Sequence, residues 1–148
     1  DRVPVRRVLS TELAAFVARI RPTFLLLQTA FSAGIARAAL TGAAETRGGL
    51  GAQFGATLTN LTDQAHALRR QLYGLAAAPA DAGVAELIRL RLDTATLAVD
   101  ATRLESTMAG GAGYALSSAA NRRLREAAFL PIQSPSEGQL RWELTRYE

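Results

Sequence analysis

The 148-residue chain contains no cysteine and no lysine, and it has a single histidine, His66. The lack of cysteine excludes disulfides, thiolate metal sites and a cysteine nucleophile. One histidine leaves too few side chains for the usual zinc ligand sets and little for a Ser-His-Asp triad. We therefore expect no metal site and no hydrolase of that kind.

Positive charge comes from arginine alone. All 17 basic residues are arginine, and 13 acidic residues leave a formal net charge of +4. The arginines are scattered along the chain instead of forming a stripe, and no recognised nucleic-acid-binding motif accompanies them. We interpret the arginine content first as a compositional bias, and we do not expect nucleic acid as a partner.

Long hydrophobic runs are also missing. The longest uncharged stretches are residues 106–121 and 22–36, with 16 and 15 residues. A bilayer requires about 18 to 20 apolar residues, so we expect no membrane span. No signal-peptide pattern opens the chain, so we expect a cytoplasmic protein. The chain begins with Asp1 in place of Met, and we expect it to be a piece of a longer protein.

Alanine, with 30 positions, dominates what is present, while valine and isoleucine are scarce. This composition favours helices over strands. We predict an extended segment over residues 1–9 and, over 10–148, an all-α antiparallel bundle of three long helices plus shorter ones. The expected helices cover about 10–20, 22–45, 56–73, 81–108, 119–129 and 136 onward.

Several residues mark the expected helix boundaries. Pro22 suits the first position of the second helix, and Gly74 is a predicted left-handed cap. Asp81 and Ser136 are predicted N-caps, and Gln139 would complete a capping box with Ser136.

Apolar spacing indicates which helix faces are inside. Residues Phe24, Leu27, Phe31, Ile35 and Leu40 recur near helical spacing, and we expect that helix to be buried on most sides. The third helix carries an apolar seam stepping by 3, 4, 3 and 4 residues. That seam consists of Leu58, Leu61, Ala65, Leu68 and Leu72.

Five short motifs occur in order along the chain. They are Gly-Ile-Ala-Arg-Ala-Ala-Leu at 34–40, Glu-Thr-Arg-Gly-Gly-Leu-Gly at 45–51, Gly-Gly-Ala-Gly-Tyr at 110–114, Arg-Glu-Ala at 125–127 and Ile-Gln-Ser-Pro-Ser at 132–136. From about Pro22 onward, the chain resembles the C-terminal helical domain of the acyl-CoA dehydrogenase superfamily.

The resemblance implies an FAD-dependent flavoprotein whose N-terminal helical domain and β-domain are missing here, and which forms a homodimer or homotetramer through the bundle. By position, Arg47 matches the arginine that reaches the FAD pyrophosphate, and Gly110 and Gly111 match a loop beside the cofactor. Ser136 matches a hydroxyl near phosphate, and Arg21 is the nearest match to an arginine that contacts an acyl-CoA substrate. The fragment alone is expected to be inactive.

The chain departs from the family where the catalytic glutamate belongs. Ser134 and Phe24 occupy the two positions at which members carry this base, and neither side chain can remove a proton unaided. Three functions therefore stay open. They are a dehydrogenase acting on the CH–CH bond of an acyl thioester, a flavin-dependent monooxygenase of the same superfamily, and a helical dimerisation or interaction module without catalysis.

Overall fold

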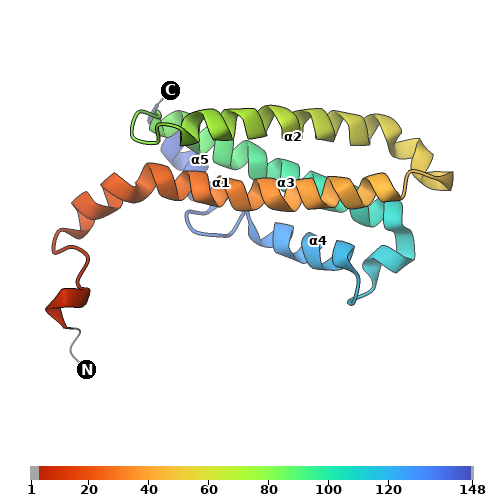
Figure 1. Cartoon of the computed structure of the whole chain (residues 1–148), viewed down its shortest axis with the longest axis horizontal. Coiled ribbons are helices and arrows are strands. Elements are labelled where there is room, and N and C mark those ends of the chain that lie inside the picture. The colour runs from red at the N-terminus through yellow and green to blue at the C-terminus, as the bar shows by residue number, and fades with distance from the viewer. Residues whose placement is uncertain (1–3, 148) are drawn as a thin grey trace.

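The computed structural model describes residues 4–147, and over this range the protein is helical without strands (Figure 1). Three helices are long and two are short. A single-turn 3-10 segment precedes α1, and a two-turn 3-10 segment precedes α2. The elements are η1 Val5–Arg7, α1 Leu13–Glu45, η2 Gly49–Phe54, α2 Gly55–Ala76, α3 Val84–Tyr114, α4 Ala119–Phe129 and α5 Glu137–Leu144. The predicted all-α class, with three long helices and shorter ones, is confirmed.

The core lies between α1 and α3, with α2 and α4 packed against both (Figure 1). One part of the core is rich in alanine, and Ala36, Ala39 and Ala98 have no exposed surface. The other part is built from larger side chains and includes Leu140 of α5. Small side chains allow helix backbones to approach closely, so the abundant alanine is used where α1 and α3 meet.

α1 is one continuous helix, and the predicted break at Pro22 is wrong. The helix runs from Leu13 to Glu45 with Pro22 inside it. A proline in a helix lacks one N–H donor, which leaves the carbonyl of residue 18 without its usual partner. Ala18 lies in an exposed part of the helix, where water can satisfy that carbonyl.

The predicted burial of α1 on most sides is also wrong. Phe24, Leu27 and Phe31 are 47%, 55% and 58% exposed. The buried face of this part of α1 consists of Leu25, Leu26, Gln28, Thr29 and Ser32. Apolar periodicity identified a helix face correctly but could not show that no other described element covers it.

Some of the other predicted helix boundaries are confirmed and others are wrong. The helix over 119–129 and the capping box of Ser136 with Gln139 are confirmed. Gly74 is not a left-handed cap, because α2 continues to Ala76 and only Gly49 and Gly110 have positive φ among the described residues. Asp81 does not cap α3, which begins after Gly83.

Two further expectations concern the chain before α1 and the end of α3. Residues 5–7 form a 3-10 turn after Pro4 instead of an extended strand, and residues 1–3 lie outside the described range. The helix predicted to end near residue 108 is instead interrupted at Gly110, with φ of 59°, and helical turns resume up to Tyr114.

The seam predicted for α2 is confirmed. Leu58, Leu61 and Leu72 are buried, while Ala65 and Leu68 are half-buried against the same core. α2 therefore packs on one side of the α1–α3 pair through this seam and leaves its opposite face in solvent.

α1 is the one described helix that is long and apolar enough to cross a membrane by length and composition. Its most apolar window has a mean hydropathy of 1.3, and 44% of that window is buried within the structure. A helix that packs in the core of a bundle meets the same criteria. The absence of a membrane span stays a prediction.

Candidate functional site

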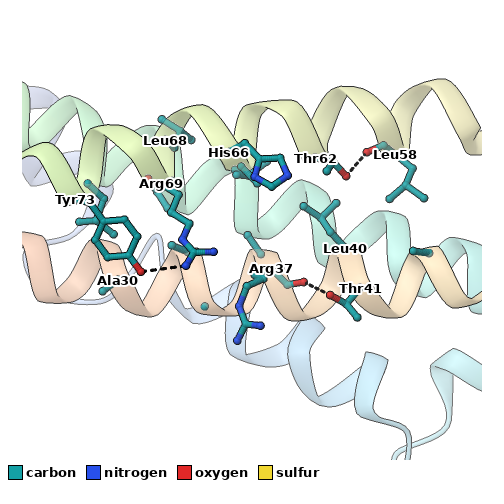
Figure 2. A pocket seen from close by; sticks show the side chains of 18 of the residues that line it. Ala30, Arg37, Leu40, Thr41, Leu58, Thr62, His66, Leu68, Arg69 and Tyr73 are labelled. Atoms are coloured by element: carbon teal, nitrogen blue, oxygen red, sulfur yellow. Dashed lines mark hydrogen bonds between the residues drawn. The ribbon is translucent and has the colours of Figure 1, made fainter.

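A groove of about 640 Å³ runs between α1 and α2 with α3 as its floor (Figure 2). We call it the α1–α2 groove. Its polar lining comprises Arg37, Thr41 and Arg47 on the α1 side, Thr62, His66, Arg69 and Tyr73 on α2, and Thr94 on α3, while its apolar lining includes Leu40, Leu58, Leu68, Leu72 and Leu97. Antiparallel packing of the two helices sets Ala30 opposite Tyr73 at one end and Thr41 near Thr62 toward the other.

The groove carries positive charge only. Three arginines, Arg37, Arg47 and Arg69, line it together with His66, and no Asp or Glu does. All three arginines are exposed, and none belongs to an ion pair within residues 4–147. Guanidinium groups without a carboxylate partner are suited to bind an anion, because they offer fixed, planar sets of N–H donors.

Some hydroxyl groups of the groove already form hydrogen bonds within the protein. Thr41 donates to the carbonyl of Arg37 at 3.0 Å, and Thr62 donates to that of Leu58 at 2.7 Å. Arg69 donates to the Tyr73 hydroxyl at 3.3 Å, and its guanidinium carbon lies 5.2 Å from the centre of that ring. Within the described residues, the free donors of the groove are therefore the remaining guanidinium N–H groups, the O–H of Tyr73 and the imidazole of His66. Their position above an apolar floor favours an organic anion over a bare inorganic one.

The structure does not bring all four predicted cofactor residues together. Arg47 lines the groove, just before η2. Gly110 and Gly111 follow Met108 of α3, whose methyl lies beside Gly51 of η2, so they lie at the same end of the bundle as Arg47. Ser136 lies instead at the start of α5, toward the other end (Figure 1).

Ser136 has a clear local role. Its hydroxyl accepts from the backbone N–H of Gln139, and the Gln139 side chain accepts from the backbone N–H of Ser136. This capping box satisfies two of the N–H groups that a helix start leaves without partners.

The two positions at which the resemblance implies a catalytic base are Phe24 on α1 and Ser134 in the turn before α5. Gln28, one turn after Phe24 on α1, donates its Nε2 to the carbonyl of Ser134 at 2.7 Å. Phe24 is half-exposed, and Ser134 lies in the turn before α5. The side chains at both positions carry no carboxylate, so neither is a proton acceptor of the required kind.

The acidic residues nearest this turn already have partners. Glu143 forms a two-point ion pair with Arg21, with Nη1 of the arginine 2.7 Å from Oε1. The hydrogen bond to Glu143 raises the pKa of the Arg21 guanidinium above its ordinary value, although burial opposes this. Glu137 pairs with Arg141 at 2.7 Å. Arg21, the candidate substrate contact, is thus occupied in joining α1 to α5.

A buried arginine supports the same turn from α3. Arg91 is 2% exposed, and its Nη2 donates to the carbonyl of Leu130 at 3.1 Å and toward Oε1 of Gln133 at 3.4 Å. Burial lowers the pKa of this guanidinium from its ordinary value, and the charge of Glu137 acts in the opposite direction. Arg91 therefore connects α3 to the turn that contains Ser134.

Sequence patterns did not identify Arg37, His66, Arg69 or Tyr73 as groove residues. His66 is exposed, on the groove side of α2 (Figure 2). Helical spacing would have placed 62, 66, 69 and 73 on one face of α2. That spacing does not show which helix packs opposite this face. The groove forms only because α1 lies there. Among residues 4–147, no cluster of three His, Asp or Glu side chains could hold a metal ion.

Comparison of the chain with protein-family models, with curated proteins and with solved structures finds no significant match.

Proposed function

We propose that this chain is a helical domain of an FAD-dependent oxidoreductase resembling the acyl-CoA dehydrogenases, and that it binds the FAD diphosphate in the α1–α2 groove. The observation that carries the proposal is the position of Arg47 in a groove that two further arginines, Arg37 and Arg69, and no acidic residue line. Arg37 precedes Arg47 by ten residues, about 15 Å along a helix, so we place the diphosphate at Arg47. Arg47 is the residue that the sequence resemblance independently implies for the pyrophosphate.

The residues present fit such a group. A diphosphate brings two adjacent negative charges, and arginine can bind phosphate oxygens through two parallel N–H donors. The apolar floor from Leu40 to Leu72, with the Tyr73 ring at one end, suits the aromatic part of a nucleotide. When bound, FAD supplies the hydride or oxygen chemistry, and this chain contributes binding and orientation.

The chemistry of the complete protein follows from which base is available. Dehydrogenation of an acyl thioester requires a carboxylate at the position of Phe24 or Ser134, or one supplied from elsewhere. The monooxygenase alternative needs no such base. The pairing of Glu137 and Glu143 with arginines favours that second candidate. Oxygen-dependent product formation by the complete protein would identify it, whereas an enoyl thioester product would identify the dehydrogenase.

The test is direct binding of FAD to the chain, measured by quenching of flavin fluorescence. We expect Arg47→Ala to weaken binding at least about tenfold, because a charge-assisted hydrogen bond contributes about 1.5 to 3 kcal/mol. The matched control is Arg70→Ala, which removes an exposed arginine of the same helix pair that does not line the groove. ADP should compete with FAD, and riboflavin, which has no phosphate, should not.

Equal weakening by both substitutions would contradict a specific site, since it would reflect net charge alone. Complete lack of FAD and ADP binding would overturn the proposal and favour a helical interaction module without catalysis. Assembly into homo-oligomers and with further domains of the same protein is part of the proposed function.

A further inference from the structure

Six apolar side chains form a continuous exposed stripe along the N-terminal part of α1. They follow one another at steps of 4, 3, 4, 3 and 4 residues, and their exposed fractions lie between 39% and 73%. We call them the α1 stripe: Leu13, Val17, Ile20, Phe24, Leu27 and Phe31. Residues 13, 20 and 27 and residues 17, 24 and 31 each recur every seven residues, which is the repeat with which one helix packs along another.

The stripe lies where the chain itself provides no cover. The first turns of α1 extend beyond the other helices (Figure 1). Between Leu13 and Ile20 only Phe16 is half-buried, and the remaining residues are exposed. Side chains on the other face of α1, such as Leu25 and Leu26, are buried in the bundle, so the stripe is the face left over.

The same heptad continues into the part of α1 that is covered. The next positions are Gly34 or Ile35 and then Ala38, and there Arg122 and Glu126 of α4 border the same shallow depression. Ile35 and Ala38 are half-buried, in contrast to the residues before them. Helix packing thus already occurs along this line, and it stops where α4 ends.

We propose that the α1 stripe is the contact surface for a second copy of this chain, with the two α1 helices antiparallel about a twofold axis at Pro22. In this register Leu13 faces Phe31, Val17 faces Leu27, and Ile20 faces Phe24. Every layer then pairs a side chain from the N-terminal half of the stripe with an equal or larger one from the other half. Each projecting helix start would lie along the bundle part of its partner.

Charge permits this arrangement. The positions that flank the stripe are uncharged except Arg21, and they include Ala14, Thr23 and Ala30. Two copies of Arg21 would come near each other beside the axis, but each already forms an ion pair with Glu143 of its own chain. The two pairs together have no net charge, so like-charge repulsion is not expected to prevent the contact.

Size also fits a weak to moderate dimer. Six side chains of this kind, at these exposures, contribute on the order of 600 Å² per copy, against about 800 Å² per partner in a standard interface. A bilayer surface is the main competing occupant, since α1 is apolar and basic. Helices that bind a lipid surface carry Lys or Arg beside the apolar face, whereas the positions flanking the stripe are uncharged except Arg21, which is already paired, so the observations favour a second helix.

Cysteine cross-linking tests the register, because the chain contains no cysteine of its own. Leu13→Cys and Phe31→Cys are both made at exposed positions and should leave the fold intact. In the proposed dimer, mixing the two variants gives a disulfide-linked species of twice the monomer mass. Neither variant cross-links alone, because two copies of residue 13 would lie about 27 Å apart along the helices. Cross-linking of each variant with itself would instead show parallel helices and overturn the proposal.

Analytical ultracentrifugation of the 148-residue chain tests the surface. We expect a dimer that Leu27→Glu converts to monomer, while the control Leu116→Glu, at an 80% exposed leucine outside the stripe, stays dimeric. A wild-type chain that is monomeric throughout the concentration series overturns the proposal. So does a monomer that co-sediments with vesicles of phosphatidylcholine and phosphatidylserine. This proposal rests on the homo-oligomeric assembly named in the proposed function but not on the groove, so FAD binding by a monomer would support the groove and contradict the dimer surface.

Discussion

The two halves of α1 are equally helical but packed in different ways. Residues from Ser32 onward face α2, α3 and α4, and Ala36, Ala39 and Ala43 have no exposed surface. The half before Ser32 carries larger apolar side chains, yet those of the α1 stripe are exposed. Small residues therefore occur where other helices of the chain surround α1, whereas large apolar residues occur on both its buried and its exposed face.

This difference shows that hydrophobicity alone does not predict burial. Leu25 and Leu27 are the same residue type two positions apart, and their exposed fractions are 1% and 55%. The helix rotates by about 200° over two residues, so one side chain enters the bundle and the other leaves it. Substitutions in such matched positions measure the difference directly.

The largest effect is expected from the two leucines themselves. Leu25→Ala should lower the free energy of unfolding by about 2 to 5 kcal/mol, because it leaves a cavity in a packed core. Leu27→Ala should change it by less than about 0.5 kcal/mol in the monomer. Urea unfolding followed by circular dichroism at low protein concentration provides the comparison. Similar losses for both would mean that the stripe is covered within one chain.

Alanine substitutions at two glycines of α1 are expected to change the stability of the fold by smaller amounts and in opposite directions. A methyl group added at Gly42 would overlap the carboxylate of Glu105, which pairs with Arg123 and is 3% exposed. Gly42→Ala should therefore destabilise the fold by about 1 to 2 kcal/mol, despite its better helix propensity. The hydrogen bonds that Arg123 donates to Glu105 raise the pKa of its guanidinium, although burial opposes this.

Gly34→Ala is the matched control, because an added methyl there meets nothing within 4 Å. It should stabilise the fold by about 0.5 to 1 kcal/mol through helix propensity alone. Thermal unfolding of both variants would show opposite shifts. Destabilisation by Gly34→Ala would mean that the free face of α1 is more tightly packed than described.

The smallest effect concerns how the helices begin. Ser136→Ala removes the capping box of α5 and should cost about 1 kcal/mol. Ser10→Ala should change stability by less than about 0.5 kcal/mol, because α1 begins at Leu13 without a side-chain cap. Hydrogen exchange of the first amides of each helix distinguishes the two. An equal loss of protection at both ends would contradict the assigned caps.

Much of the secondary structure could be predicted from local patterns. The Ser136 box, the 119–129 helix and the leucine seam of α2 depend on neighbours within a few residues, which the sequence displays directly. Pro22 was misjudged because its cost depends on solvent access to the carbonyl of residue 18. The groove could be predicted only in part. Arg47 was identified by resemblance, whereas Arg37, Arg69 and Tyr73 lie on two helices whose pairing no local pattern reveals.

The sequence by itself determined that this protein is helical, free of thiol chemistry and charged through arginine, because propensity and side-chain chemistry are local properties. It also determined that the positions of Phe24 and Ser134 carry no carboxylate. Only the tertiary structure decided which face of α1 is buried, which arginines share a groove and which carboxylates are already paired. These depend on contacts between residues far apart in the chain, and such contacts are set by packing of whole helices.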